Sequence, residues 1–417
     1  METFGEALRR LRTERGISLR ELARRASVDP GHLSRVEAGR RPPTPQMAAA
    51  VARALKAGSA LQELARRSVR IRLQAGGWGR RDVDELAAAL VAEAPTADTA
   101  LRLAHEWLVT DPPQVYELSA GRHVGIGTAD AVRTRVHQLR LLDDHAGGAA
   151  THELAVRELS VTVDLLRDAA YSEVVGRALL SVLAELCQIA GWMTSDAGRP
   201  AEAVRYYLTG VRSAHAAGDA AVAASNLSSL AYQESNIGDS RHAVLLAASA
   251  VRGAERTTSA AGRAIVAERL AWACARAGEP RGVDRALGEA DEAYAGRLPG
   301  DDPQWTYWLD EAEMAVMAGR CWTQLRRPLR AVPILEAATR GYGADRARES
   351  ALYLSWLAEA YLQAGEVERA AEAALRALDL DRRAGSSRSA SRIGTLRRLF
   401  EPYAGSAAVA GFQEASR

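Results

Sequence analysis

The stretch GISLRELARRASVDPGHLSRVEAGRRPPTP, residues 16–45, contains two short amphipathic segments on either side of a tight turn. In the first segment, residues 18–26, apolar side chains recur at the spacing that places them on one face of a helix. The second segment opens with Asp29, a good N-cap, and with Pro30, which suits the first helical position. Gly39 suits the residue that follows the helix. The stretch therefore predicts two consecutive short helices.

Further helices are predicted on both sides of this pair. Residues 4–15 have Leu8 and Leu11 on one face, and residues 44–55 and 59–73 predict a fourth and a fifth helix. Two short helices joined by a tight turn in such a bundle form a helix-turn-helix, whose second helix enters the major groove of DNA.

Residues 4–65 resemble the XRE-type, lambda-repressor-like helix-turn-helix family. The resemblance is carried by apolar, capping and glycine positions in register, namely Leu22, Ala23, Val28, Leu33, Ser34, Val36, Glu37, Gly39, Arg41 and Pro43. It implies that Arg12 pairs with Glu37 and fixes the second motif helix. The chain departs from the family at Leu19, where the family often has a Gln that contacts a phosphate. The alternative is a degenerate motif that only packs or dimerises.

The solvent side of the second motif helix carries the side chains that we expect to contact DNA. Arg35 suits a bidentate hydrogen bond to guanine, and Gly31, four residues earlier on the same face, permits close backbone approach. Basic residues after the helix suit the phosphate backbone. The predicted DNA-binding residues are Gly31, His32, Ser34, Arg35, Arg40 and Arg41.

Charge is unevenly distributed along this chain of 417 residues, whose formal net charge is only +2. Residues 1–70 contain fifteen Arg or Lys and seven Asp or Glu, whereas the remainder is acidic overall. A basic N-terminal part joined to an acidic body is the electrostatic pattern of a DNA-binding module attached to another domain.

Composition favours an all-α protein of more than one domain. The chain is 47% hydrophobic but only 5% aromatic, and it is rich in the helix formers Ala, Leu and Arg. Cys187, Cys274 and Cys321 are far apart, which indicates reduced core residues of a cytoplasmic protein rather than disulfides or a zinc site. The sequence has no apolar run of transmembrane length, no signal peptide and no catalytic constellation at usable spacing. We therefore expect a protein that is not an enzyme and has no metal or cofactor.

The segment after the N-terminal domain gives weaker signals. Residues 74–79 (QAGGWG) predict a linker, and residues 82–93 and 96–110 predict two short helices. The glycine-rich residues 121–127 (GRHVGIG) precede a helix, as a phosphate-binding loop would. Because the lysine of such a loop and an evident preceding strand are missing, we favour a simple turn.

A group of acidic and histidine residues lies close together further along the chain: Asp143, Asp144, His145 and His152. These residue types are metal ligands, so a metal site is one interpretation. A solvated helix end before Gly147 and Gly148 is the interpretation that we favour.

From about residue 179 onward the chain repeats itself. The turn residues Gly198, Gly238, Gly278, Arg326 and Gly365 are 40, 40, 48 and 39 positions apart. A small residue lies seven positions before each turn and another lies twelve positions after it, which lets two antiparallel helices pack closely. The pattern resembles the tetratricopeptide repeat, in which helical hairpins stack into a superhelix.

The tetratricopeptide analogy also predicts which side chains line the concave face. Six positions before the turn, consecutive repeats carry Trp192, Tyr232 and Trp272, and amides and charges flank them. Such a mixture is typical of a groove that binds a zwitterionic ligand or a peptide, although packing between repeats is the alternative role for the aromatic rings. The predicted effector-binding residues are Gln188, Trp192, Asp196, Ser228, Tyr232, Asn236, Glu268, Trp272, Arg276 and Arg320.

These features predict an all-α chain in which a five-helix lambda-repressor-like helix-turn-helix domain precedes an α-solenoid of tetratricopeptide-like helical hairpins. The predicted boundaries are residues 1–73 for the DNA-binding domain, 74–127 for a linker and short helical region, 128–385 for the solenoid and 386–417 for C-terminal capping helices.

The combined layout resembles the RRNPP-type cytosolic regulators and regulators of this kind in actinobacteria. The resemblance implies a cytoplasmic, sequence-specific transcription regulator that binds pseudo-palindromic double-stranded DNA as a homodimer. It also implies a peptide or small-molecule effector in the solenoid and no membrane partner. The alternative is a DNA-binding regulator whose solenoid is a protein-docking scaffold with no small effector.

Overall fold

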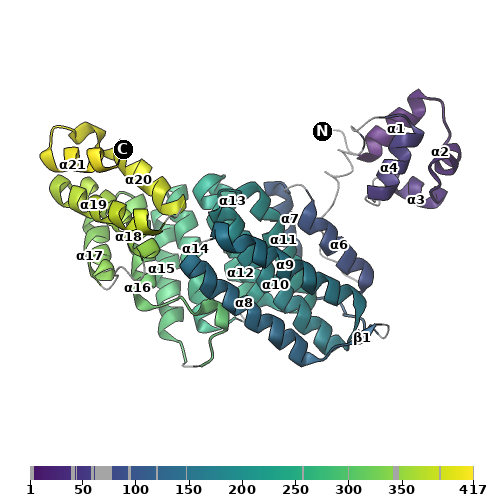
Figure 1. Cartoon of the computed structure of the whole chain (residues 1–417), viewed down its shortest axis with the longest axis horizontal. Helices are drawn as coiled ribbons and strands as arrows, with labels where there is room; N and C mark the ends of the chain where they lie inside the picture. The colour runs from purple at the N-terminus through teal and green to yellow at the C-terminus, as the bar shows by residue number, and fades with distance from the viewer. Residues whose placement is uncertain are drawn as a thin grey trace.

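The computed structural model describes residues 4–38, 43, 45–57, 61, 78–92, 95–118, 121–146, 148–255, 258–298, 300–340, 347–384 and 387–416. Over these residues the fold is all-α, as predicted, apart from one pair of two-residue strands. Figure 1 shows two groups of helices, a small N-terminal group and a long group of stacked helix pairs. We call the first group (residues 4–61) the head and the second (residues 78–416) the body.

The head has its own hydrophobic core. Its helices are α1 (Phe4–Glu14), α2 (Leu19–Ala26), α3 (Pro30–Glu37) and α4 (Pro45–Ala54). Leu8, Leu22, Leu33 and Val51 from these four helices are fully buried together. The fifth helix predicted for residues 59–73 lies outside the described residues, except for Leu61, which is buried in the same core.

Short-range capping fixes the two motif helices where the sequence predicted them. The Ser18 hydroxyl accepts a hydrogen bond from the Glu21 backbone N–H (3.2 Å), and Asp29 Oδ1 accepts one from the His32 backbone N–H (2.7 Å). Between the helices, Ser27 adopts a left-handed conformation with φ of 54°, which makes the turn tight. The helix-turn-helix predicted from the sequence is therefore present.

Two helices, α6 (Arg80–Val91) and α7 (Ala97–Val109), begin the body. Trp78, at the end of the predicted linker, is 2% exposed and packs in the body core. On α7, the Trp107 ring lies over Gly253 so closely that a Cβ on Gly253 would be 1.9 Å from the ring. The short helices are thus an integral part of the body.

Next come α8 (Ile126–Ala146) and α9 (Gly148–Asp168), a helical pair that precedes the repeats. Strand β1 (Arg122–His123) pairs in parallel with β2 (Ala169–Ala170). Gly121 has φ of 125°, and a Cβ there would lie 2.0 Å from the Asp168 carbonyl oxygen. Gly121, the first glycine of the GRHVGIG segment, therefore allows this backbone to lie close to the end of α9.

The predicted repeats form helical hairpins whose adjacent pairs stack along the body (Figure 1). The hairpins are α10 (Glu173–Asp196) with α11 (Pro200–Ala217), α12 (Ala220–Ile237) with α13 (Ser240–Ala254), α14 (Ala260–Ala277) with α15 (Pro280–Ala295), α16 (Glu311–Gln324) with α17 (Pro328–Thr339), and α18 (Ala347–Ala364) with α19 (Val367–Ala384). The terminal elements are α20 (Ser387–Phe400), the 3-10 turn η3 (Glu401–Tyr403) and α21 (Ala407–Ala415). A further 3-10 turn, η1 (Gln304–Thr306), precedes α16.

The turn residues within the hairpins explain the repeat pattern. Gly198, Gly278 and Gly365 have φ between 72° and 82°, where residues with a Cβ are strained. Arg326 occupies the equivalent turn with φ of 55°, so this hairpin keeps the left-handed conformation without glycine. Gly238 does not share this left-handed conformation, since its φ is −111°.

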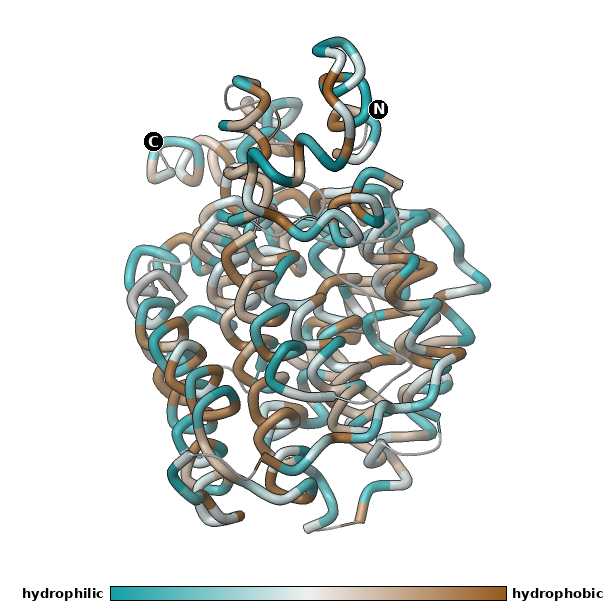
Figure 2. Tube along the Cα trace, turned by 90° about the vertical axis from the view of Figure 1, so that its right-hand side faces the viewer, coloured by the Kyte–Doolittle hydropathy of each residue, from teal (hydrophilic) through white to brown (hydrophobic). Residues whose placement is uncertain are grey.

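Small residues at the predicted positions allow the helices of a hairpin to approach each other. A Cβ on Gly191 would lie 2.7 Å from the buried Tyr207 ring, and one on Gly319 would lie 2.5 Å from Leu335. Figure 2 shows apolar and polar turns alternating along the helices, as expected of helices that bury one face.

Helix α10 is long and apolar enough to cross a membrane by length and composition, with a mean hydropathy of 1.5. However, 72% of its apolar window is buried within the fold. Its hydrophobicity is therefore explained by contact with α8, α9, α11 and α12, which surround it.

Candidate functional site

Helix α3 is held against α1 by two close contacts. Arg12 Nε and Nη2 donate hydrogen bonds to the two carboxylate oxygens of Glu37 at 2.7 and 2.6 Å, as the family resemblance implied. Gly5 lies so near the end of α3 that a Cβ on it would be 2.8 Å from the Val36 and Glu37 carbonyl oxygens. A bidentate Arg–carboxylate pair fixes orientation as well as distance, so α3 is rigidly presented.

The outer face of α3 is available to a partner. Gly31, Ser34 and Arg35 are exposed, and His32 is half-buried. A Cβ on Gly31 would lie 3.3 Å from Asp29 Oδ1, the N-cap of α3, and 3.6 Å from Arg35 Nη1, an ordinary contact distance. Arg40 and Arg41, the predicted phosphate contacts, lie outside the described residues.

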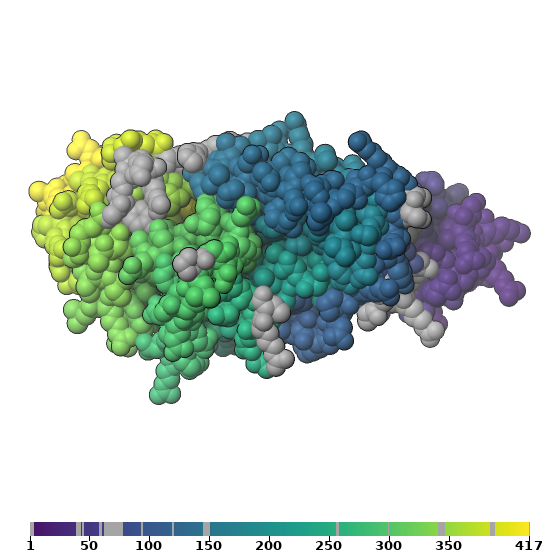
Figure 3. Space-filling model, turned by 90° about the horizontal axis from the view of Figure 1, so that it is seen from below, coloured from purple at the N-terminus to yellow at the C-terminus, as the bar shows by residue number. Residues whose placement is uncertain are grey.

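The body contains a cavity of about 190 Å³ on the inner side of the repeats. The walls come from α8, α10, α12, α14, α16, α18, α20 and the segment before α16. In the space-filling view, the blue surface of α8 and α9 abuts the green surface around residues 300–320 (Figure 3). The lining residues are Arg140, Asp143, Asp144, Gln188, Ile189, Trp192, Ser225, Ser228, Ser229, Tyr232, Ile265, Glu268, Arg269, Trp305, Tyr307, Trp308, Glu313, Val316, Met317, Arg320, Arg348, Glu349, Leu352, Tyr353 and Arg388.

Six of the ten predicted effector-binding residues line this cavity. They are Gln188, Trp192, Ser228, Tyr232, Glu268 and Arg320. All six lie either six or ten positions before a turn, on the first helices of consecutive hairpins. Those two register positions therefore face the cavity on α10, α12 and α16, whereas Trp272 on α14, also six before its turn, is not in the lining.

The other four predicted residues, Asp196, Asn236, Trp272 and Arg276, lie outside the lining of this cavity. Asp196 is paired with Arg388 at 2.6 Å. Trp272 is 1% exposed, belongs to the body core and donates its indole N–H to Asn236 Oδ1 at 3.1 Å. Arg276 is exposed and donates to Ser235 O and Gln324 Oε1. Two positions before the turn, Asn236 and Arg276 thus contact neighbouring repeats, and Asp196 pairs with the terminal helix α20.

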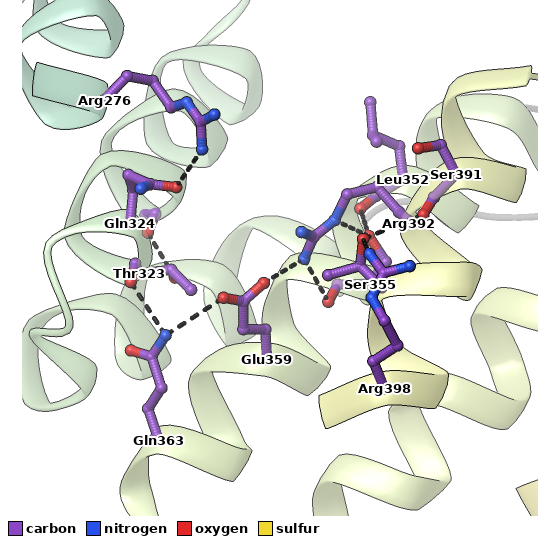
Figure 4. A network of polar contacts seen from close by, with 12 residues as sticks. Arg276, Thr323, Gln324, Leu352, Ser355, Glu359, Gln363, Ser391, Arg392 and Arg398 are labelled. Carbon is purple, nitrogen blue, oxygen red and sulfur yellow. Dashed lines mark hydrogen bonds and ion pairs between the residues drawn. The ribbon is translucent and has the colours of Figure 1, made fainter. Parts of the chain in front are cut away.

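Figure 4 shows how these contacts continue along the body. Arg276 on α14 reaches Gln324 on α16, and Gln363 on α18 donates to the Thr323 carbonyl oxygen at 3.1 Å. Glu359 then accepts a hydrogen bond from Arg392 on α20. These contacts, which include the predicted effector residue Arg276, link the hairpins to each other and to the terminal helix.

Aromatic and guanidinium groups stack along one wall of the cavity. The Trp192 and Tyr232 rings are stacked with centroids 5.9 Å apart. The Arg269 guanidinium lies 4.0 Å from the Tyr232 centroid, 5.5 Å from Trp192 and 5.9 Å from Trp308. Such cation–π contacts hold a guanidinium in place without using its N–H donors.

Several cavity residues gave no signal in the repeat analysis. Arg140, Asp143 and Asp144 come from α8, Arg388 comes from α20, and Arg269 lies one position after a predicted residue. The Tyr307 hydroxyl donates to Asp144 on α8. Arg269 directly follows the predicted Glu268 in the same helix, but it is at neither of the two register positions that the repeat analysis used.

The structure changes the interpretation of the acidic group on α8. Asp143 is 2% exposed rather than solvated, and it accepts a hydrogen bond from the Thr151 hydroxyl at 3.2 Å. Among the described residues, no group of three or more His, Cys, Asp and Glu side chains is arranged to hold a metal ion. The side chain of His145 lies outside the described residues.

Burial changes the acidity of three cavity residues. It raises the pKa of Glu268 to about 8 and that of Asp143 to about 6. Burial also acts to raise the pKa of Tyr232, but the positive charges of Arg320, Arg269 and Arg388 outweigh it and lower the pKa to about 7. At neutral pH the Glu268 carboxyl is therefore mainly uncharged, and the cavity wall around Tyr232 is electropositive.

Comparison with known families supports one part of the chain. Residues 3–65 match a family model described as a helix-turn-helix domain. No curated protein matches the chain. The head is therefore a helix-turn-helix domain, of a kind that indicates a DNA-binding regulator, and the function of the body has to be argued from its structure.

Proposed function

We propose that this chain is a sequence-specific transcription regulator whose body binds a small effector and thereby alters DNA binding by the head. The observation that supports this proposal best is the cavity at the inner side of the repeats, where aromatic rings and ionisable groups from separate hairpins converge. A pocket with apolar walls and a few convergent polar groups is the usual form of a ligand site.

DNA recognition is assigned to the exposed face of α3. Arg35 is the side chain best suited to read guanine, because its exposed guanidinium can donate two parallel hydrogen bonds. Ser34 and His32 lie beside it, and Gly31 allows the helix backbone to come close to the groove. Arg40 and Arg41 would contact phosphates, as the sequence predicts.

The body is proposed to be a tetratricopeptide-like solenoid that senses its ligand internally. The alternative role, a docking scaffold for another protein, requires a concave surface that a polypeptide can enter. Here residues from α8, α18 and α20 share the space with the repeat helices, and the cavity measures about 190 Å³. A small molecule fits that volume better than a folded partner or an extended peptide.

Two copies of the chain are proposed to act together. Helix-turn-helix domains bind half-sites roughly 34 Å apart when they are paired by a dimer, so a pseudo-palindromic operator is expected. The effector would shift DNA affinity by binding one arrangement of the body better than another.

The test of DNA recognition compares Arg35→Ala with Arg24→Ala. Arg24 is also exposed but lies on α2, paired with Glu21. The wild type first selects its preferred sequences from a random library. Arg35→Ala should discriminate between these and other sequences by about 1–3 kcal/mol less than the wild type does, whereas Arg24→Ala should rank them as the wild type does. An Arg35 variant that retains the wild-type preference would refute the assignment of α3 as the reading helix.

The test of sensing uses the operator found in that selection. Metabolite pools that raise the melting temperature of the full chain should also change its affinity for the operator. A ligand that stabilises the body and leaves operator affinity unchanged would refute the regulatory link. Co-purification of a protein partner with no stabilising metabolite would support the scaffold alternative instead.

A further inference from the structure

We propose that the cavity binds a small aromatic acid whose anionic group pairs with Arg269. This inference rests on the proposed function, because it names the chemical class of the effector. It departs from the zwitterionic or peptide ligand expected from the sequence.

Four of the five arginines that line the cavity already have polar partners. Arg140 pairs with Glu185 at 2.9 Å, and Arg388 pairs with Asp196 at 2.6 Å. Arg320 donates to the Tyr232 hydroxyl at 2.9 Å. Arg348 donates to the Asp143 carbonyl oxygen at 3.1 Å and lies 3.9 Å from its carboxylate. These guanidinium groups support the cavity wall.

Arg269 differs from them. It is 9% exposed, and among the described residues it has neither an ion pair nor a hydrogen bond, only stacking contacts with aromatic rings. An arginine cannot lose its charge by deprotonation, so a buried one needs a compensating anion. Its position in the lining makes the cavity interior the place where that anion binds.

No acidic residue of the same lining forms an ion pair with Arg269 among the described residues, and the Tyr232 phenol, which its pKa of about 7 leaves partly ionised at neutral pH, accepts its hydrogen bond from Arg320. Asp144 accepts from the Tyr307 hydroxyl, and Glu313 accepts from the Tyr353 hydroxyl at 2.5 Å. Glu349 lies 3.5 Å from Arg348. Glu268 is buried with an unpartnered Oε1, and its carboxyl is mainly protonated at neutral pH, so it offers a hydrogen-bond donor rather than a negative charge.

The rest of the lining indicates the shape and polarity of the ligand apart from its anionic group. The indole rings of Trp192, Trp305 and Trp308 and the side chains of Ile265 and Met317 line the same cavity. Flat apolar groups stack favourably on such rings. A cavity of about 190 Å³ has room for one or two fused rings with a short side chain. The cavity therefore fits a planar apolar molecule with one acidic group.

Carboxylate and phosphate both match the fork of a guanidinium, so the acidic group could be either. Titration calorimetry on the full chain distinguishes them with matched probes. The acids are benzoate, phenylacetate, indole-3-acetate and phenyl phosphate. The neutral and cationic counterparts are benzamide, phenylacetamide, indole-3-acetamide and tryptamine.

We expect at least one acid to bind about tenfold or more tightly than its amide, and tryptamine not to bind. Arg269→Met should remove this preference, while Arg269→Lys should retain part of it. Arg276→Met is the matched control, because Arg276 lies on the same helix but outside the lining. Circular dichroism establishes that each variant is folded.

Equal binding of acids and amides by the wild type would overturn the proposal, and so would an acid preference that survives in folded Arg269→Met. Failure of every acid to bind at millimolar concentration would overturn it as well. If an acid binds through Arg269 but leaves operator affinity unchanged, the regulatory function fails while the ligand class stands. If a neutral or cationic metabolite controls operator affinity, the ligand class fails while the regulatory function stands.

Discussion

Replacing Glu268 with Gln is expected to make the protein more stable at alkaline pH and to leave it nearly unchanged at acid pH. Glu268 is 2% exposed, its Oε1 has no hydrogen-bond partner, and burial raises its pKa from 4.5 to about 8. Below about pH 4.5 the carboxyl is protonated in both the folded and the unfolded chain, so its ionisation costs nothing there.

As pH rises from 4.5 toward 8, the unfolded chain releases the proton and the folded chain keeps it. Each pH unit in this window therefore lowers the free energy of unfolding by about 1.4 kcal/mol. The accumulated loss reaches on the order of 3–5 kcal/mol near pH 8, and Gln avoids it because an amide does not ionise. Above the folded-state pKa the loss stops growing.

The assay is thermal unfolding of the full chain from about pH 5 to about pH 8, followed by circular dichroism. We expect Glu268→Gln to raise the melting temperature by roughly 5 °C or more at the alkaline end. Glu289→Gln on the neighbouring helix α15 is the control, because Glu289 is exposed. If Glu268→Gln and the wild type lose stability in parallel over this range, the carboxyl is ionised in the folded protein and the cavity is more hydrated than we infer.

Three further outcomes test the structure. Tyr232→Phe should remove a tyrosinate absorbance that appears near pH 7 in the wild type, whereas Tyr403→Phe on the surface should not; persistence of that absorbance would place the acidic phenol elsewhere. Trp272→Ala should lower the free energy of unfolding by roughly 3–5 kcal/mol in urea titrations, because the ring is core; a loss near zero would contradict its burial. Gly191→Ala should cost about 1–3 kcal/mol, since its Cβ meets the buried Tyr207 ring, while Gly394→Ala, in open space on α20, should cost nothing.

Short-range patterns account for what could be predicted in the head. Ser18, Asp29 and Pro30 set the starts of α2 and α3 through contacts within three residues, so each helix carries its own boundary signal. The Arg12–Glu37 pair required the family resemblance, because 25 residues separate the two positions.

The repeats were predictable for a similar reason. Each hairpin turn needs a residue that can adopt a left-handed conformation, and each helix crossing needs a small residue. These turn and crossing residues therefore recur in the sequence at a fixed spacing. The same register selected six residues of the cavity lining, since positions six and ten before the turn share one face of a first helix. It also selected Trp272 and Arg276, which are not in the lining, because register does not say whether a neighbouring side chain fills the space in front.

The sequence by itself determined the all-α class, the helix-turn-helix and the hairpin repeats, because these depend on propensities and contacts between residues close together in the chain. Only the tertiary structure decided the chemistry of the cavity. Asp196 and Arg388 are 192 residues apart, and Arg348 reaches Asp143 across 205 residues. Pairings of this kind engage some cavity arginines and leave Arg269 with aromatic contacts alone among the described residues, and no local pattern encodes which arginine is left over.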